Sequence, residues 1–299
     1  MHPYLEAARP RTLPAAVAPV LVGTFAAATP TSGLRVERAL LALVVALALQ
    51  VAVNYANDYF DGVRGVDTED RAGPRRAVAS GLIAPAAMRR ATGIALVVAA
   101  IAGLVLAALV GWELLLVGAV AIVATLGYSG GPKPYASAGL GELMVFVFFG
   151  VVATAGSAYV QDERLTVLPL LTSIPMGSFA VALLVVNNLR DIPTDRAAGK
   201  VTLAVRLGED RTRALFGVLL AVAYLSLGPV GRVTDTLWVF APVVSIPLAL
   251  RAMATVRRAT TPRELIPALQ ATSLAQGAYA LLLVLGLALA RTLGEGVAT

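Results

Sequence analysis

Long apolar runs alternate with short polar segments along the whole chain. Nine runs are long enough to cross a lipid bilayer as helices: 14–29, 39–57, 91–110, 113–129, 140–160, 167–187, 214–231, 236–253 and 267–290. A transmembrane helix needs about 20 predominantly apolar residues. We therefore predict an all-α fold, a polytopic membrane bundle of about nine transmembrane helices that forms a single domain over residues 1–299.

Composition supports this prediction and argues against a soluble protein. Hydrophobic residues make up 58% of the chain and charged residues 14%. The net charge of +6 comes from basic residues in short loops between apolar runs, so we attribute it to membrane topology and expect no nucleic-acid partner. Because the chain has no cysteine, disulfides, thiolate metal sites and cysteine nucleophiles are excluded.

The distribution of basic residues predicts the orientation of the bundle. With nine spans, 19 of the 24 Lys and Arg residues fall on the same side as the N-terminus. Positively charged loops are retained on the cytoplasmic side of a membrane. We therefore expect a multi-pass protein of the cell membrane, with the N-terminus and the two largest basic loops, 58–90 and 190–213, in the cytoplasm.

A dense group of polar side chains follows the second apolar run. It contains Asn57, Asp58 and Asp61, with Asp67 further along. Asn57 and Asp61 are four residues apart and would share one face of a helix. Oxygen ligands grouped in this way suit Mg²⁺, which completes its coordination with water and substrate phosphate. The alternative is a solvated acidic loop between two helices.

The same pattern returns after the sixth apolar run, which argues against the solvated loop. Asn187, Asp191 and Asp195 follow one another at spacings of four. The two patterns lie on the same predicted side of the membrane, with four spans between their starting points. This arrangement predicts a parallel four-helix pseudo-repeat with one additional helix. Two carboxylate groups that face each other would hold Mg²⁺ ions on either side of a diphosphate.

Basic residues near both patterns suit the same ligand. Arg190 adjoins Asp191, Lys200 follows Asp195, and Lys133 lies in a Gly-Gly-Pro-Lys-Pro turn. Arg provides bidentate contacts to phosphate and Lys acts as a point charge. The alternative is that basic residues only mark topology, an interpretation we prefer for Arg89, Arg90, Arg257 and Arg258.

Aromatic residues near the acidic patterns offer faces that stabilise cations. Tyr128, just before the Lys133 turn, is the best candidate to shelter an allylic carbocation. Phe146, Phe148 and Phe149 would serve equally well as lipid-facing or interfacial residues.

These residues resemble the UbiA superfamily of intramembrane aromatic prenyltransferases. The segment Asn57-Asp58-Tyr59-Phe60-Asp61 with Asp67 resembles the first Asp-rich motif of that family, and Asp191-Ile192-Pro193-Thr194-Asp195 resembles the second. Within the superfamily, three local patterns are similar to the 1,4-dihydroxy-2-naphthoate polyprenyltransferase branch: residues 8–14, 57–67, and 187–191 with 199–203. The six-residue step from Asp61 to Asp67 departs from the shorter spacing of the 4-hydroxybenzoate branch.

The resemblance implies an enzyme that uses Mg²⁺ to detach diphosphate from a polyprenyl diphosphate. The allylic cation then alkylates 1,4-dihydroxy-2-naphthoate, carboxylate is lost, and demethylmenaquinol forms, which is a step of menaquinone biosynthesis. The lipid bilayer would accommodate the prenyl chain.

The site residues expected on this basis fall into three overlapping groups. The expected metal ligands are Asn57, Asp58, Asp61, Asp67, Asn187, Asp191 and Asp195. The expected catalytic residues are Asp58, Asp61, Asp191, Asp195, Lys133 and Arg190. The expected substrate contacts are Arg11, Arg71, Tyr128, Lys133, Arg190 and Lys200.

Two alternatives remain open from the sequence. A related prenyltransferase would use 4-hydroxybenzoate, homogentisate or phosphoribosyl diphosphate as its acceptor. An ion-coupled secondary transporter would also carry acidic residues at equivalent positions of a parallel repeat. Transporters place such residues near the bilayer midplane, whereas here they lie at the ends of apolar runs.

Overall fold

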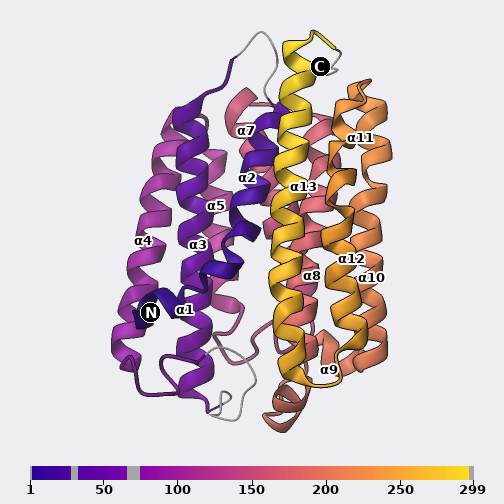
Figure 1. Ribbon diagram of the computed structural model, residues 1–299. Coiled ribbons are helices and arrows are strands. Elements are labelled where there is room, and N and C mark those ends of the chain that lie inside the picture. The colour runs from indigo at the N-terminus through magenta and orange to yellow at the C-terminus, as the bar shows by residue number, and fades with distance from the viewer. Residues whose placement is uncertain (1, 28–32, 66–74, 296–299) are drawn as a thin grey trace.

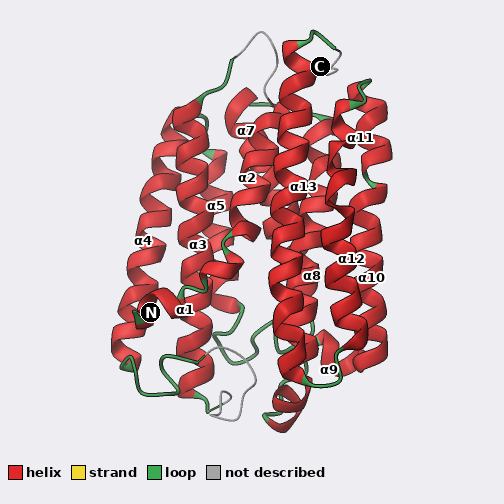
Figure 2. Cartoon of the chain, in the orientation of Figure 1, coloured by secondary structure: helices red, strands yellow, loops and turns green. Residues whose placement is uncertain are grey.

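The computed structural model describes residues 2–27, 33–65 and 75–295, and this part of the chain consists of helices and loops without a β-strand (Figures 1 and 2). Within these described ranges, seven helical segments are long and apolar enough to cross a membrane: Val36–Val63, Pro85–Leu109, Gly141–Asp162, Val167–Ala197, Glu209–Thr234, Trp238–Arg258 and Pro262–Thr292. The prediction of an all-α membrane bundle is confirmed.

Two further apolar helices are shorter, α2 (Pro14–Ala27) and α5 (Glu113–Gly127). Together with the seven long segments they coincide with the nine predicted apolar runs. At 1.5 Å per residue, the 14 residues of α2 span roughly 21 Å, less than the ~30 Å of a bilayer core. The number of segments that cross the membrane completely therefore stays a prediction.

Four long helices are continuous: α3 (Val36–Val63), α4 (Pro85–Leu109), α8 (Val167–Ala197) and α13 (Ile266–Thr292). Three other long segments are composite. The first joins α6 (Gly141–Val145), the π-helix η2 (Phe146–Val152) and α7 (Ala153–Asp162). The second joins α10 (Glu209–Leu225) and α11 (Leu227–Thr234), and the third joins η3 (Trp238–Ser245) and α12 (Ile246–Arg258). Short helices complete the fold: α1 (Pro3–Ala7), η1 (Pro10–Thr12), α9 (Leu203–Leu207) and η4 (Pro262–Leu265).

The axes of the long helices run roughly parallel to one another, and the helices form two groups that lie side by side (Figure 1). In one group α3 packs against α4, which contacts α5; in the other α8 packs against α10. α2 lies between the groups and contacts α3, α7, α8 and α13. The pairing of α3 with α4 and of α8 with α10 is the pairing that the parallel pseudo-repeat requires, although the repeat itself stays a prediction.

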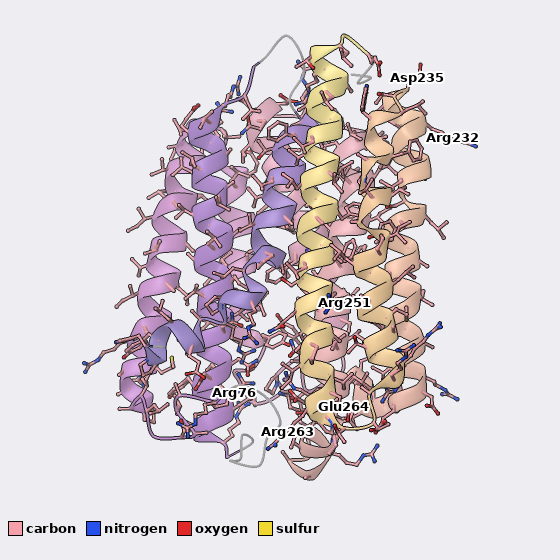
Figure 3. All side chains as sticks on the ribbon, viewed as in Figure 1. Arg76, Arg232, Asp235, Arg251, Arg263 and Glu264 are labelled. Carbon is pink, nitrogen blue, oxygen red and sulfur yellow. The ribbon has the colours of Figure 1, made fainter. Side chains whose placement is uncertain are left out.

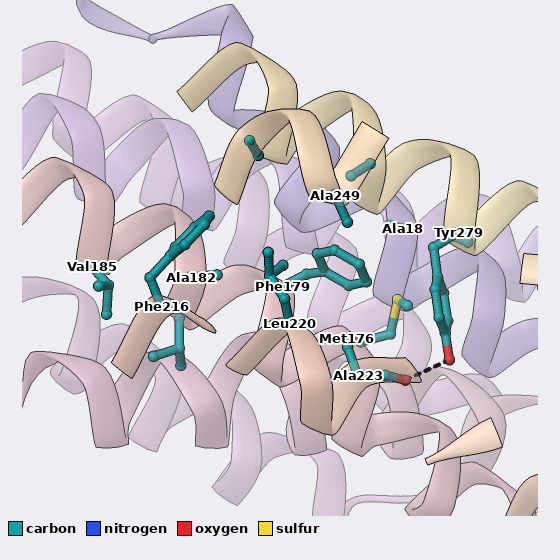
Figure 4. Packing of buried hydrophobic residues seen from close by; sticks show 14 of the residues in the cluster. Ala18, Met176, Phe179, Ala182, Val185, Phe216, Leu220, Ala223, Ala249 and Tyr279 are labelled. Carbon is teal, nitrogen blue, oxygen red and sulfur yellow. Dashed lines mark hydrogen bonds between the residues drawn. The ribbon is translucent and has the colours of Figure 1, made fainter. Parts of the chain in front are cut away.

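The main core surrounds α8, whose side chains are buried on several faces (Figure 4). Phe179 of α8 stacks edge-on against Tyr279 of α13, with ring centroids 5.3 Å apart. The Tyr279 hydroxyl donates a 2.9 Å hydrogen bond to the Ala223 carbonyl of α10, so this buried phenol is satisfied inside the bundle. Small residues such as Ala182 and Ala249 let neighbouring helices approach closely.

The outer faces of the bundle are largely apolar, and most of the labelled charged side chains lie near its two ends; Arg251, inside α12, lies between them (Figure 3). Ile101 of α4 and Leu116 of α5 are 59% and 71% exposed, as lipid-facing side chains would be. Arg232 and Asp235 lie at one end of the molecule, and Arg76, Arg263 and Glu264 at the other (Figure 3). This distribution fits a multi-pass membrane protein.

Candidate active site

The last turns of α3 and α8 carry the two acidic patterns, called here the first acidic motif (Asn57–Asp61) and the second acidic motif (Asn187–Asp195). Residues from both motifs line one small polar cavity of about 50 Å³. Its lining comprises Asn57, Asp61, Asn187, Asp191, Asp195, Asn188, Thr194, Leu184, Tyr128, Lys200, Arg9 and Arg76. The structure thus brings the two motifs together, as the sequence predicts.

Lys200 joins the two motifs. Its ammonium lies 3.3 Å from Asp61 Oδ2 of the first motif and 4.0 Å from Asp195 Oδ1 of the second. The end of α8 dictates this position, because Gly199 adopts φ +69° and the Lys200 N–H donates back to the Asp195 carbonyl at 2.8 Å. This is the Schellman pattern, which favours glycine and turns the following residue back toward the helix.

Arg190 binds its neighbour Asp191 and does not itself line the polar cavity. Its Nε and Nη2 donate to the two oxygens of the Asp191 carboxylate at 2.7 and 2.8 Å, and both residues are buried. Such a bidentate pair compensates two charges that would be costly to bury alone. The structure pairs Arg190 with Asp191, and its direct contact with a diphosphate stays a prediction.

Asp58 also faces away from the polar cavity. Its two carboxylate oxygens accept hydrogen bonds from the backbone N–H groups of Ala77 (3.0 Å) and Val78 (2.8 Å). The side chain is 1% exposed and is absent from the cavity lining. In the structure Asp58 fastens the 75–80 turn, and that turn brings Arg76 to the cavity. The role of Asp58 as a metal ligand stays a prediction.

Arg9 is a cavity residue that the sequence reasoning missed. It adopts a left-handed backbone conformation (φ 53°), which is uncommon for a side chain other than glycine or asparagine. Side chains of two helices hold the adjoining backbone in place: Asn54 donates to the Ala8 carbonyl at 2.9 Å, and Ser273 donates to the Arg11 carbonyl at 3.0 Å. The fold therefore enforces the conformation that directs Arg9 into the site.

A larger apolar cavity of about 280 Å³ adjoins the polar one. It is lined by residues of α2, α3, α4, α5, α6, η2, α7 and α8, and Phe148 and Phe149 of the π-helix contribute two aromatic faces. The two cavities share the lining residues Arg9, Asn57, Tyr128, Leu184 and Asn187. The arrangement can hold a charged group next to a long apolar group.

The π-helix η2 shapes the wall of the apolar cavity. π-helical turns are rare and often occur at functional sites. η2 crosses α8 at a close contact between Gly150 and Gly177, where a side-chain Cβ on Gly150 would lie 2.7 Å from the Gly177 Cα. Phe146 packs against Gly177 and the core, and does not line either cavity.

Tyr128 lies at the boundary between the two cavities. Its ring packs edge-on against Tyr135 at 5.5 Å, and its burial, together with the nearby Glu142 carboxylate, raises the pKa of the hydroxyl well above its usual range. The hydroxyl therefore keeps its proton at neutral pH and acts as a hydrogen-bond donor. Tyr128 remains a candidate to stabilise a cation, as predicted.

Glu142 is a second residue that the sequence reasoning missed. It is 7% exposed and lies at the start of α6, where its Oε1 accepts a 2.9 Å hydrogen bond from Asn188 of the polar cavity. Its Oε2 has no hydrogen-bond partner within the described part of the chain. The carboxylate fixes the Asn188 amide beside the second motif.

Two other predicted residues, Lys133 and Arg11, are not brought into the site. Lys133 is exposed in the turn after α5. Arg11 is also exposed, and its backbone carbonyl accepts the hydrogen bond from Ser273 described above. Neither residue lines a cavity. Asp67 and Arg71 lie outside the described residues, so their predicted roles stay predictions.

The donor atoms of the polar cavity fit a divalent metal only together with ligands from a substrate. Among the described residues, no three acidic or histidine side chains lie close enough to hold a metal by themselves. Asn57 Oδ1 is nevertheless buried without a hydrogen-bond partner in this part of the chain, and the carboxylates of Asp61 and Asp195 flank the same space. Mg²⁺ characteristically takes one or two carboxylates and completes its coordination with substrate phosphates and water.

The chain belongs to the UbiA prenyltransferase family, whose model matches residues 16–274. Among its curated relatives is 1,4-dihydroxy-2-naphthoate octaprenyltransferase of Mycobacterium tuberculosis (strain ATCC 25618 / H37Rv), 49% identical over 278 residues that cover 93% of this chain and 94% of the relative. The protein of the same name from Escherichia coli (strain K12) is 38% identical over 299 residues, with 96% of both chains covered.

Solved structures show the same fold at low sequence identity. A UbiA homologue from Archaeoglobus fulgidus bound to DMAPP and Mg²⁺ superposes with a TM-score of 0.63 at 16% identity, covering 94% of this chain and 99% of that one. The apo structure of a UbiA homologue from Aeropyrum pernix K1 gives a TM-score of 0.70 at 15% identity, with 94% and 98% covered. The membrane bundle described above is therefore the fold of these solved UbiA homologues.

Proposed function

We propose that this protein transfers a polyprenyl chain from an allylic polyprenyl diphosphate to 1,4-dihydroxy-2-naphthoate. Diphosphate and the carboxyl group of the acceptor are lost, and the product is a demethylmenaquinol. The relatives at 49% and 38% identity, both named 1,4-dihydroxy-2-naphthoate octaprenyltransferase, support this choice of acceptor. The step would belong to menaquinone biosynthesis.

The observation that carries the proposal is the junction of the two cavities. A polyprenyl diphosphate has a charged head and a long apolar chain, and the polar and apolar cavities share five lining residues where the reactive carbon would lie. The polar cavity offers Arg9, Arg76 and Lys200 to the diphosphate oxygens. The apolar walls exclude water, which would otherwise capture an allylic cation.

Mg²⁺ would be held by oxygen atoms of both motifs, with Asn57 and Asp61 on one side and Asn187, Asp191 and Asp195 on the other. When bound, the metal would neutralise negative charge on the phosphate oxygens, including the charge that develops as the diphosphate leaves. Arg190 supports this set by orienting Asp191 through its two hydrogen bonds.

The residues at the cavity junction divide the remaining tasks. Tyr128 presents its ring and a protonated hydroxyl, so it stabilises positive charge or donates a hydrogen bond but does not act as a base. Phe148 and Phe149 offer further aromatic faces along the path of the chain. The acceptor would approach from the polar side, where Asn188 and Glu142 lie.

We further propose that the site faces the cytoplasm and that the protein resides in the cell membrane. The motif-bearing end of the bundle carries most of the basic residues, which favours a cytoplasmic location. A cysteine at exposed Ala198 should resist an impermeant thiol reagent in intact cells, whereas one at exposed Asp235, at the opposite end, should react. Because the chain has no cysteine of its own, the labelling is unambiguous. The reverse labelling pattern would invert the proposed orientation.

The direct test is product analysis with purified protein in detergent. Protein, Mg²⁺ and a polyprenyl diphosphate would be incubated with a panel containing 1,4-dihydroxy-2-naphthoate, 4-hydroxybenzoate and homogentisate, with Asp61→Ala as the inactive control. Mass spectrometry should detect a prenylated, decarboxylated product of the naphthoate, and EDTA should abolish its formation. Exclusive prenylation of another acceptor would contradict the proposed substrate. If no aromatic acceptor is prenylated, two alternatives are left: a prenyltransferase that uses phosphoribosyl diphosphate, and an ion-coupled transporter.

A further inference from the structure

The carboxylates of the two acidic motifs are all engaged by groups of the protein itself. Asp61 and Asp195 share Lys200, Asp191 binds Arg190, and Asp58 accepts two backbone N–H groups. The side chains of Lys200, Asp61 and Asp195 are only 16%, 6% and 9% exposed, so the bridge is largely shielded from water. Interactions between charges are stronger in such surroundings than at a solvated surface.

The lining of the polar cavity is also balanced in charge. Among the described lining residues, three are carboxylates (Asp61, Asp191 and Asp195) and three are cations (Arg9, Arg76 and Lys200). Arg190, which is paired with Asp191 but does not line the cavity, adds one positive charge. A divalent cation alone would make this lining strongly positive and would have to displace Lys200 from both of its partners. A diphosphate alone would make it strongly negative. The two together nearly cancel, so the balance favours joint entry.

From the bridge and the charge balance we infer that Lys200 is a binding-order residue. It occupies the space between the motifs as a substitute cation, so that the divalent metal binds only together with a diphosphate. When both arrive, the Lys200 ammonium exchanges its two carboxylates for phosphate oxygens, and the carboxylates become metal ligands. The inference deepens the proposed function and rests on it for the identity of the diphosphate.

The geometry of the α8 terminus supports a built-in role for Lys200. The left-handed Gly199 and the Lys200 N–H bond to Asp195 fix the Lys200 backbone beside the second motif without any ligand. Thr202, the N-cap of α9, lies within 3.5 Å of the Asp195 carboxylate and holds the following segment. The side chain therefore starts from a fixed point and needs only rotamer changes to move from carboxylate to phosphate.

Mn²⁺ binding tests the inference without turnover. Wild-type protein in phosphatidylcholine nanodiscs would be titrated with Mn²⁺, and free Mn²⁺ measured by electron paramagnetic resonance, with empty nanodiscs as the blank. Without diphosphate, wild type should bind Mn²⁺ weakly. Lys200→Met should bind at least about tenfold more tightly, because the buried carboxylates of Asp61 and Asp195 lose the ammonium that they share. Adding Asp61→Asn to Lys200→Met should remove that gain, since it deletes one of the ligands.

Two control variants separate the bridge from the general field of the basic loops. Lys200→Arg keeps the charge at the bridge and should behave as wild type. Arg196→Met removes an exposed cation one residue from Asp195 that lines neither cavity, and should also leave Mn²⁺ binding unchanged. If Lys200→Met binds Mn²⁺ no better than wild type, or if Arg196→Met gains as much, the inference is wrong.

Geranyl diphosphate completes the experiment. Geranyl diphosphate also binds Mn²⁺ in solution, and the empty nanodiscs measure that contribution. After this correction, adding geranyl diphosphate without acceptor should lower the dissociation constant of Mn²⁺ for wild type by at least about tenfold. If wild type binds Mn²⁺ equally well with and without geranyl diphosphate, Lys200 does not set an order. Prenyl transfer by the same preparations is measured separately. If the variants show the expected differences in Mn²⁺ binding but wild type transfers nothing to the naphthoate, the proposed acceptor is wrong. If wild type is active but the differences in Mn²⁺ binding are missing, only the role of Lys200 is wrong.

Discussion

The two acidic motifs share a sequence pattern but differ in what surrounds their carboxylates. At the end of α3, Asp58 is held by backbone N–H groups, and Asp61 depends on Lys200, which comes from the other half of the bundle. At the end of α8, Asp191 has its own arginine one residue away. The first motif is therefore completed by a distant cation, while the second carries one locally.

This difference separates two tasks that the sequence pattern alone does not distinguish. A carboxylate with a permanent buried partner, such as Asp191, is oriented at all times. A carboxylate whose partner comes from another segment, such as Asp61, changes its environment when that segment or a ligand moves. We expect substitutions at the two motifs to differ in their effects on folding even where they have similar effects on catalysis.

The largest effect is expected for the carboxylates that line the polar cavity. Asp61→Ala and Asp191→Ala should each lower prenyl transfer by at least about a thousandfold, because each removes a charge that positions the leaving diphosphate and its metal. Initial rates at saturating substrates and Mg²⁺ give the comparison. Residual activity within tenfold of wild type in either variant would show that its motif is not part of the site.

The second-largest effect is expected on the free energy of unfolding, where substitutions in the two motifs should differ. Asp191→Ala leaves the buried Arg190 without its partner, a change that typically costs about 3–5 kcal/mol. Asp61→Ala leaves Lys200 close to Asp195, so the loss should be smaller. Thermal unfolding in detergent should show a lower melting temperature for Asp191→Ala than for Asp61→Ala, and Arg190→Met combined with Asp191→Ala should recover part of the difference. Equal melting temperatures would mean that the contrast between the motifs has no energetic consequence.

Asp58 provides an intermediate effect within the first motif. Asp58→Asn keeps one oxygen for Ala77 or Val78 but turns an amide N–H₂ toward the other backbone N–H, so the 75–80 turn should loosen and Arg76 should lose its position. We expect about a tenfold loss of activity, expressed mainly as a higher KM for the prenyl diphosphate. The Mg²⁺ concentration for half-maximal rate should stay as in wild type. A large rise in that concentration would return Asp58 to the metal ligands.

The smallest effects are expected at the border of the second motif. Glu142→Gln keeps an oxygen acceptor for Asn188 but removes the charge, so we expect a few-fold rise in the KM for the aromatic acceptor and little change for the prenyl diphosphate.

Because Tyr128 keeps its proton, Tyr128→Phe should retain the pH profile of wild type between pH 6 and pH 9. Loss of a basic limb of the pH profile in Tyr128→Phe would instead assign the hydroxyl an acid–base role.

The sequence predicted those parts of the molecule that depend on regular spacing. Apolar runs of helical length located the membrane helices, and the repeated Asn-xxx-Asp spacing predicted that two distant helix ends would meet at one site. Lys200 was predicted at the site because it follows the second motif closely, and the turn at Gly199 brings it back.

The remaining site residues depend on contacts between segments far apart in the chain. Arg9 reaches the cavity only because Asn54 and Ser273, 46 and 262 residues from their bonding partners, fix the backbone around it. Asp58 is diverted by backbone groups of a later turn, and Glu142 is hidden at the start of an apolar run. Lys133 stays exposed although it belongs to a glycine-rich turn. Spacing along the sequence gives no information about such pairings.

The bond between Ser273 and the Arg11 carbonyl has a consequence for biogenesis. The N-terminal segment leaves the ribosome first, but its partner on α13 is made 262 residues later. At about 5–20 residues per second, the segment waits on the order of 10–50 seconds before its backbone can be fixed. We therefore expect the backbone around Arg9 to be fully fixed only after α13 has inserted. A nascent chain arrested before α13 should remain inactive even though both acidic motifs are already in the membrane.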